Sequence, residues 1–169
     1  MELYDIFRHL ELQWQELVHE PVYTIEQARS ISEQLPGIGV KNLLLTDRKR
    51  EHYFLVLLHE DKRADLKSIS RQTGVRHLTF GSPEELQQLL GLTPGSVSPF
   101  GIIHDAANRV EILIDAELEG RQLLLHPNTN TKTVSMCYDH LLCFIHHFNH
   151  DISLLDCPGQ MTAESGGTL

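Results

Sequence analysis

Cysteine, long apolar runs and known signature motifs are all scarce in this 169-residue chain. Its three cysteines are odd in number and lie late in the sequence, so a disulfide-stapled fold is not indicated. No apolar run approaches the roughly 20 residues of a membrane span, and the first residues do not resemble a secretory signal, so we expect a cytoplasmic protein with no membrane partner. Hydrophobic residues make up 41% of the chain and charged residues 22%, a balance typical of one globular domain.

Familiar catalytic and metal-binding patterns are missing as well. The chain has no GxxxxGK(S/T), GxGxxG, HExxH, CxxC or GxSxG pattern, which leaves nucleotide hydrolysis, zinc proteolysis and α/β-hydrolase chemistry without support. Cys143, His146, His147 and His150 offer zinc-ligand chemistry, but the pair-and-pair spacing of a structural zinc site is absent. Because Cys143 also falls within an apolar stripe, we expect no metal, and a metal-dependent hydrolase is the least favoured alternative.

The charges are unevenly distributed. The chain carries a net charge of −9, yet most of its Lys and Arg residues lie between residues 41 and 76. Three of them, Arg48, Lys49 and Arg50, follow one another in the turn between two apolar segments. Such a segment can meet a polyanion even in an acidic protein, although charge alone favours a simple solvated hairpin.

Apolar periodicity and turn residues divide the chain into alternating helices and strands. Helices are predicted over residues 2–18, 25–34, 62–72, 83–90 and 138–147. Strands are predicted over residues 40–46, 52–58, 77–80, 100–104, 109–115, 122–126, 132–136 and 152–155. Hairpins interspersed with helices predict one α+β domain over residues 1–157, built on a mixed, largely antiparallel and curved sheet flanked by helices. Gly, Ser and Thr dominate residues 158–169, for which we expect disorder.

Two of the predicted helices carry specific start signals. Thr24 followed by Gln27, and Ser82 followed by Glu85, match the capping box, in which side chain and backbone satisfy each other's unpaired donors. Gly91 is the expected stop of the helix that begins after Ser82.

Two residues stand where a site is commonly built. Lys41 begins an apolar strand, and if it faces the interior it needs an anion or carbonyl partner. Strand alternation equally allows it to face solvent. His126 ends an apolar strand and leads into a polar loop, which is typical of a site residue but also of a surface histidine.

Four segments carry a family resemblance. In chain order they are HEPVYTIEQA (19–28), KNLLLTD (41–47), LTPGSVSPFG (92–101) and HPNTNTKT (126–133). Together they resemble the prolyl-tRNA editing family, free-standing proteins related to the YbaK proteins and to the insertion domain of bacterial prolyl-tRNA synthetase. The resemblance extends over roughly residues 2–156 and implies the fold of that domain.

The resemblance implies a trans-editing deacylase that hydrolyses the ester of mischarged tRNA(Pro). The Lys-Asn pair matches the alanine-specific branch, so the expected substrate is the acceptor end of Ala-tRNA(Pro), with prolyl-tRNA synthetase as a further candidate partner and no cofactor. By the matching positions, the catalytic residues are Lys41, Asn42, Gly95 and His126. The substrate-binding residues are Thr24, Ser96 and Pro99. The basic turn formed by Arg48, Lys49 and Arg50 is assigned to tRNA binding.

This chemistry does not require a covalent nucleophile. An aminoacyl ester is already activated, so the enzyme mainly positions a water and stabilises the developing oxyanion. Backbone groups of the Gly95–Pro99 loop, Lys41 and the ribose hydroxyl of the substrate are the expected assistants. Two alternatives stay open: the same fold acting on Ser-, Thr- or Cys-charged tRNA, and a non-catalytic module that binds tRNA or a synthetase.

Overall fold

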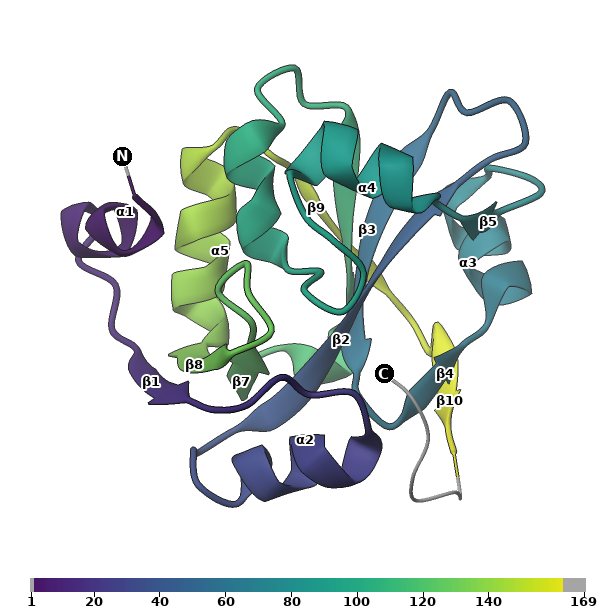
Figure 1. Ribbon diagram of the computed structural model, residues 1–169. Helices are drawn as coiled ribbons and strands as arrows, with labels where there is room; N and C mark the ends of the chain where they lie inside the picture. Colours follow the sequence, from purple (N-terminus) through teal and green to yellow (C-terminus); the bar gives the residue numbers. More distant parts are fainter. Residues whose placement is uncertain (1, 163–169) are drawn as a thin grey trace.

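Helices and strands alternate along residues 2–162, the part of the chain that the computed structural model describes (Figure 1). The helices are α1 (Leu3–His9), α2 (Ile25–Ser32), α3 (Leu66–Thr73), α4 (Pro83–Leu90) and α5 (Tyr138–His147), with 3-10 helices η1 (Pro99–His104) and η2 (Ala116–Leu118). The strands are β1 (Gln15–Val18), β2 (Ile38–Thr46), β3 (Tyr53–His59), β4 (Lys62–Ala64), β5 (Thr79–Phe80), β6 (Val110–Asp115), β7 (Gln122–Leu125), β8 (Lys132–Cys137), β9 (Ile152–Leu155) and β10 (Gly159–Met161). Within residues 2–162, no helix combines the length and the apolar character needed to cross a membrane.

The main sheet is mixed. Its strands lie in the order β1-β8-β7-β2-β3-β6-β9, and β5 pairs with β2 beside this path. The pairs β1–β8, β7–β8, β2–β3 and β2–β5 are antiparallel, whereas β2–β7, β3–β6 and β6–β9 are parallel. A separate antiparallel ladder joins β4 to β10. This arrangement confirms the α+β class and the mixed sheet predicted from the sequence.

Strand β3 lies at the centre of the core because both of its faces are covered. Successive side chains of a strand point to opposite faces. Leu55 and Leu57 therefore join one apolar cluster, and Phe54, Val56 and Leu58 join another. An uninterrupted apolar run is what a strand buried on both faces requires, and the sequence has such a run here.

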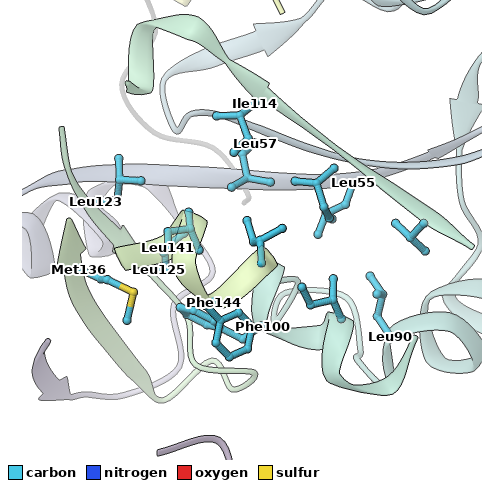
Figure 2. Packing of buried hydrophobic residues seen from close by; sticks show 14 of the residues in the cluster. Leu55, Leu57, Leu90, Phe100, Ile114, Leu123, Leu125, Met136, Leu141 and Phe144 are labelled. Atoms are coloured by element: carbon cyan, nitrogen blue, oxygen red, sulfur yellow. The ribbon is translucent and has the colours of Figure 1, made fainter. Parts of the chain in front are cut away.

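Different helices cover the two faces. Leu90 of α4, Phe100 of η1 and Phe144 of α5 pack on the face that carries Leu55 and Leu57 (Figure 2). The rings of Phe100 and Phe144 meet edge to face with centroids 5.0 Å apart, a favoured aromatic geometry. On the other face α3 contributes the fully buried Ile69. These two layers fix β2 and β3, on which the site described below is built.

The helix predicted over residues 2–18 is wrong in its second half. Helix α1 ends at His9, and Glu11 then adopts a positive φ of 56°, which a right-handed helix does not allow. Residues 15–18 instead form β1 and pair with β8. Pairing with a distant strand supplies these residues with backbone hydrogen bonds that helical periodicity alone does not anticipate.

Two further element predictions need correction. The helix predicted over residues 62–72 begins later, because Lys62–Ala64 forms β4 and the Asp65 side chain caps α3 by accepting from the Ser68 N–H. The strand predicted over residues 100–104 is the 3-10 helix η1. Its start is fixed by Pro99 at the first position and by the Ser98 side chain, which accepts from the Phe100 N–H.

The expectation of disorder from residue 158 onward is wrong for its first residues. Gly159–Met161 forms β10, which pairs with β4 in antiparallel register. The Asp65 N–H also donates to the Pro158 carbonyl over 2.7 Å. Small polar residues do not prevent pairing when a neighbouring strand offers unpaired backbone groups. Residues 163–169 lie outside the described part of the chain.

Candidate active site

A cavity of about 340 Å³ opens where α2, the first half of β2 and the ends of β7 and β8 meet the loop that follows α4. Its wall is mainly apolar. The polar residues that line it are Ser32, Lys41, Asn42, Glu60, His126 and Thr133. An apolar cavity with a few converging polar groups is the usual form of a small-ligand site.

Lys41 faces this cavity from β2. Its side chain is half-buried, and Nζ donates to the backbone carbonyl of Lys62 on β4. Burial lowers the pKa of the Lys41 ammonium, and the negative charges of Asp61 and Glu60 oppose this effect. Of the two orientations that the sequence allowed, the structure has the interior one with a carbonyl partner.

Asn42, the next residue on β2, leaves an acceptor unused. Its Nδ2 donates weakly to the Val40 carbonyl over 3.4 Å. Its buried Oδ1 has no hydrogen-bond partner among residues 2–162. An unsatisfied buried acceptor costs about 1–3 kcal/mol, so a donor on a bound ligand would recover that free energy.

His126 lies across the cavity at the end of β7. Its Nδ1 is 3.1 Å from the Lys132 carbonyl, which favours a proton on that nitrogen. Burial lowers the pKa of His126, and the charge of the neighbouring His19 adds to this effect, whereas the hydrogen bond to the Lys132 carbonyl opposes it; the net shift favours the neutral ring. His19 is itself held by Thr133, whose Oγ1 lies 2.8 Å from its Nε2.

The loop after α4 brings backbone to the cavity at Gly95. This residue has a positive φ of 89°, which glycine adopts without strain. A Cβ placed here would lie 3.7 Å from Asn130 Nδ2, in the polar loop that follows β7. Asn130 also bonds both the N–H and the carbonyl of Val22, at 3.3 and 3.0 Å, and so holds the segment before α2 at the cavity wall.

Several residues assigned from the sequence do not line the cavity. Thr24 caps α2, where its side chain accepts from the Gln27 N–H in the predicted capping box. The Ser96 N–H donates to the Thr93 carbonyl, and Pro99 is buried at the start of η1. These contacts give Thr24 and Pro99 structural roles in shaping the walls.

The basic turn lies at the opposite end of β2 from the cavity. Arg48 and Lys49 are exposed, whereas Arg50 pairs with Glu85 of α4 at 3.1 Å. Because a strand rises about 3.3 Å per residue, Lys41 and Arg48 are roughly 20 Å apart along the chain direction. The structure therefore separates the proposed tRNA-binding cations from the cavity.

The residues of the Cys- and His-rich segment lie in different surroundings. His150 is buried and its Nε2 lies 2.9 Å from Asp105 Oδ2, so this side chain is already engaged. Cys143 is exposed, which corrects its expected place within an apolar stripe.

Sequence reasoning missed Glu60 and Gly39 on the cavity wall. The two residues face each other across the β2–β3 hairpin, where the Glu60 N–H donates to the Gly39 carbonyl over 2.9 Å. The observed register, in which Val40 pairs with His59, places them opposite each other. However, nothing in the local pattern distinguishes this glutamate from the other acids nearby.

Comparisons with known proteins identify the family of this chain. The aminoacyl-tRNA editing domain family matches residues 19–144, which contain every polar residue of the cavity wall. The chain belongs to the aminoacyl-tRNA editing domain family. This membership confirms the resemblance that the four sequence segments indicated.

Relatives of this editing-domain chain share most of its length. It is 39% identical over 133 residues to the prolyl-tRNA editing protein ProX of Acetoanaerobium sticklandii, covering 78% of this chain and 81% of that protein. It is 30% identical over 142 residues to the prolyl-tRNA synthetase associated domain-containing protein 1 of Mus musculus, covering 82% of this chain and 84% of that protein. A crystal structure described as a candidate trans-editing enzyme for prolyl tRNA synthetase has the same fold, with a TM-score of 0.65 at 22% identity over 90% of this chain and 95% of that one.

Proposed function

We propose that this protein is a trans-editing deacylase that hydrolyses the ester bond of mischarged Ala-tRNA(Pro). One observation carries the proposal: Lys41, Asn42 and His126 meet around one cavity in a chain similar to a prolyl-tRNA editing protein. The acceptor end of the tRNA is the part that has to enter, because the scissile ester lies at its terminal ribose. Prolyl-tRNA synthetase, which makes the mischarged product, is a further candidate partner.

In the proposed mechanism, water attacks the ester carbonyl directly. The backbone at Gly95 approaches the ester and supplies N–H groups to the developing oxyanion. Lys41 contributes a compact positive charge. Asn42 has both donors and an acceptor, so it orients the ester through its Nδ2 donor or the water through its unused Oδ1. Neutral His126 holds the terminal ribose, whose neighbouring hydroxyl assists the proton transfer. Together these groups hold the water and the ester in position for attack. Positioning suffices because the ester is already activated.

Selectivity against proline is steric in this proposal. A synthetase pocket rejects an amino acid that lacks a methylene or two by only about 1–3 kcal/mol, so alanine is mischarged. A second and smaller site can instead exclude the larger cognate residue. Val22, Ile31 and Val97 are the apolar side chains that would contact the amino acid and set this limit.

A second specificity has one observation in its favour. The Asn42 Oδ1 acceptor that lacks a partner within residues 2–162 would suit the hydroxyl or thiol of serine, threonine or cysteine. An alanine side chain has no such donor. In the alanine proposal this acceptor bonds a ribose hydroxyl or the attacking water.

The test is deacylation of Ala-tRNA(Pro) beside Pro-tRNA(Pro) and Ala-tRNA(Ala), each with and without EDTA. We expect rapid loss of alanine from tRNA(Pro) alone, unaffected by the chelator. Faster release from Ser-, Thr- or Cys-charged tRNA would select the second specificity. Binding without hydrolysis of any of these substrates would indicate a non-catalytic module, and inhibition by EDTA would indicate a metal-dependent hydrolase.

A further inference from the structure

Glu60 places its carboxylate in the cavity by lying across the backbone of β2. An ideal Cβ at Gly39 would lie 2.0 Å from Glu60 Oε2, so any other residue at position 39 would displace the carboxylate. The Glu60 N–H donates to the Gly39 carbonyl, which fixes the backbone from which this side chain folds back. The pairing of a glycine with this glutamate therefore creates a defined place for a negative charge on the cavity wall.

The surroundings leave this carboxylate incompletely satisfied. Among residues 2–162, Glu60 forms no ion pair with a Lys, Arg or His side chain. The nearby Lys41 ammonium donates to the Lys62 carbonyl instead. The Ser32 hydroxyl has one hydrogen, for which Glu60 competes with the Ala28 carbonyl. Burial and the charge of Asp61 raise the pKa of Glu60, and the Ser32 hydroxyl and the charges of Arg29 and Lys41 oppose this rise only in part.

Every aminoacyl ester brings a cation into such a cavity. Its α-amino group, with an ordinary pKa of about 7.7–8.0, is largely protonated at pH 7, whereas an alanine side chain offers only a methyl group. A buried carboxylate next to apolar walls is the protein group best suited to an ammonium ion. Lys41 would repel that ion, so the ammonium would lie on the Glu60 side and the ester on the Lys41 side.

We propose that Glu60 is a substrate-binding residue that recognises the α-ammonium group of the aminoacyl ester and thereby orients the ester toward Lys41. This inference rests on the proposed function and names the group of the substrate that this wall of the cavity binds. The contact with Glu60 would distinguish an aminoacyl ester from an ester of the same shape that lacks the amine.

The experiment uses two non-hydrolysable amides of 3′-amino-3′-deoxyadenosine, one carrying alanine and one carrying lactate. Lactate replaces the ammonium with a hydroxyl of nearly the same size. The Kd of each is measured for the wild-type chain, for Glu60→Gln and for the matched control Asp61→Asn, which alters a neighbouring carboxylate outside the cavity wall. We expect the wild type and Asp61→Asn to favour the alanyl amide by about 10- to 100-fold, the range for a hydrogen bond between charged groups. Glu60→Gln should bind both amides with similar affinity.

Gly39→Ala provides a second route to the same result. It leaves the glutamate in the chain but moves its carboxylate, so it should also reduce the preference for the alanyl amide. Equal weakening of both amides in Glu60→Gln, or an unchanged preference, would overturn the inference and assign Glu60 a structural role.

Hydrolysis of alanyl- and lactyl-tRNA(Pro) separates binding from chemistry. If Glu60→Gln slows both reactions equally with unchanged Kd values, Glu60 acts on the water, and the proposed recognition is wrong. If the wild type prefers the alanyl amide yet hydrolyses no charged tRNA, the deacylase proposal fails while ammonium recognition stands.

Discussion

The two ends of strand β2 differ in how completely their charged groups are paired. At the hairpin tip, Asp47 Oδ1 accepts from the N–H groups of Glu51 and His52 at 2.8 and 3.2 Å, and Arg50 pairs with Glu85. The backbone hydrogen bonds lower the pKa of Asp47 even though desolvation raises it. The tip thus pairs most of its polar groups within the hairpin and with α4, and the buried Thr46 Oγ1 is the exception.

At the cavity end the polar groups are left incomplete. Asn42 Oδ1 has no partner within the described residues, and Lys41 has a carbonyl but no counter-ion within bonding distance. Glu60 forms no ion pair within residues 2–162, although the charges of Arg29 and Lys41 lower its pKa. Buried polar groups are normally satisfied, so a cluster of exceptions requires an explanation. A polar ligand that completes all three contacts explains why such an arrangement is tolerated next to a well-packed core.

The largest expected effect is that of Lys41→Ala. Loss of the positive charge at the ester should lower kcat/KM for Ala-tRNA(Pro) by about 100-fold or more, the range found when one transition-state donor is removed. Stability should change by less than about 1 kcal/mol, because the side chain is only half-buried and forms no ion pair. Single-turnover deacylation and chemical denaturation measure the two effects.

Lys49→Ala is the matched control at the other end of β2. It removes the same charge from an exposed position and should leave single-turnover hydrolysis at saturating enzyme within about twofold, since exposed substitutions have small effects. If Lys41→Ala is as active as Lys49→Ala, the cavity end of β2 does not contribute a catalytic charge, and the prediction is wrong.

The sequence predicted best what depends on neighbouring residues. Both capping boxes form as expected, at Thr24 with Gln27 and at Ser82 with Glu85, because all partners lie within four positions. Helix α5 spans the predicted residues 138–147. Lys41, Asn42, Gly95 and His126 were selected by resemblance to a family, and they do line one cavity.

The elements that the sequence did not predict depend on distant partners. Strand β1 forms by hydrogen bonding to the edge of β8, and β10 forms by hydrogen bonding to β4. The local periodicity of either segment therefore does not predict it. The role of Glu60 depends on the register of the β2–β3 hairpin and on the absence of a side chain at Gly39. Such features require knowledge of which strands meet.

A smaller effect is expected when the chain is ended at Pro158. Strand β10 is then lost, and with it the pairing of β4, whose Lys62 carbonyl holds the Lys41 ammonium. We expect stability to fall by about 1–3 kcal/mol, since each lost hydrogen bond is worth about 0.5–1.5 kcal/mol. Hydrolysis should slow by about 3- to 10-fold, because a misplaced catalytic group lowers the rate.

A chain ended at Thr162 keeps β10 and serves as the control for this truncation. Thermal unfolding and deacylation are measured for both truncated chains and for the full chain. If the chain ended at Pro158 matches the one ended at Thr162 in stability and rate, then β10 does not support the cavity end of β2.

The smallest effect on hydrolysis is expected at the hairpin tip. Arg48 and Lys49 are exposed and belong to no ion pair within residues 2–162, so they are available to the phosphates of a tRNA acceptor stem. The double substitution Arg48→Ala with Lys49→Ala should weaken tRNA binding by about 2- to 10-fold at low salt. It should also reduce the slope of log Kd against log salt by about 1–2, since each phosphate contact contributes about 0.7–0.9.

This last change acts on affinity alone, because the tip lies roughly 20 Å from Lys41 along β2 and does not contact the ester. A minimal substrate that ends in aminoacyl-adenosine and lacks the stem should therefore be hydrolysed equally well by the double variant and the wild type. Fluorescence titration of tRNA(Pro) at several salt concentrations provides the affinity and the slope. An unchanged slope of log Kd against log salt would mean that the tRNA backbone contacts another face of the protein. The cavity and the hairpin tip would then not bind the same tRNA molecule along β2.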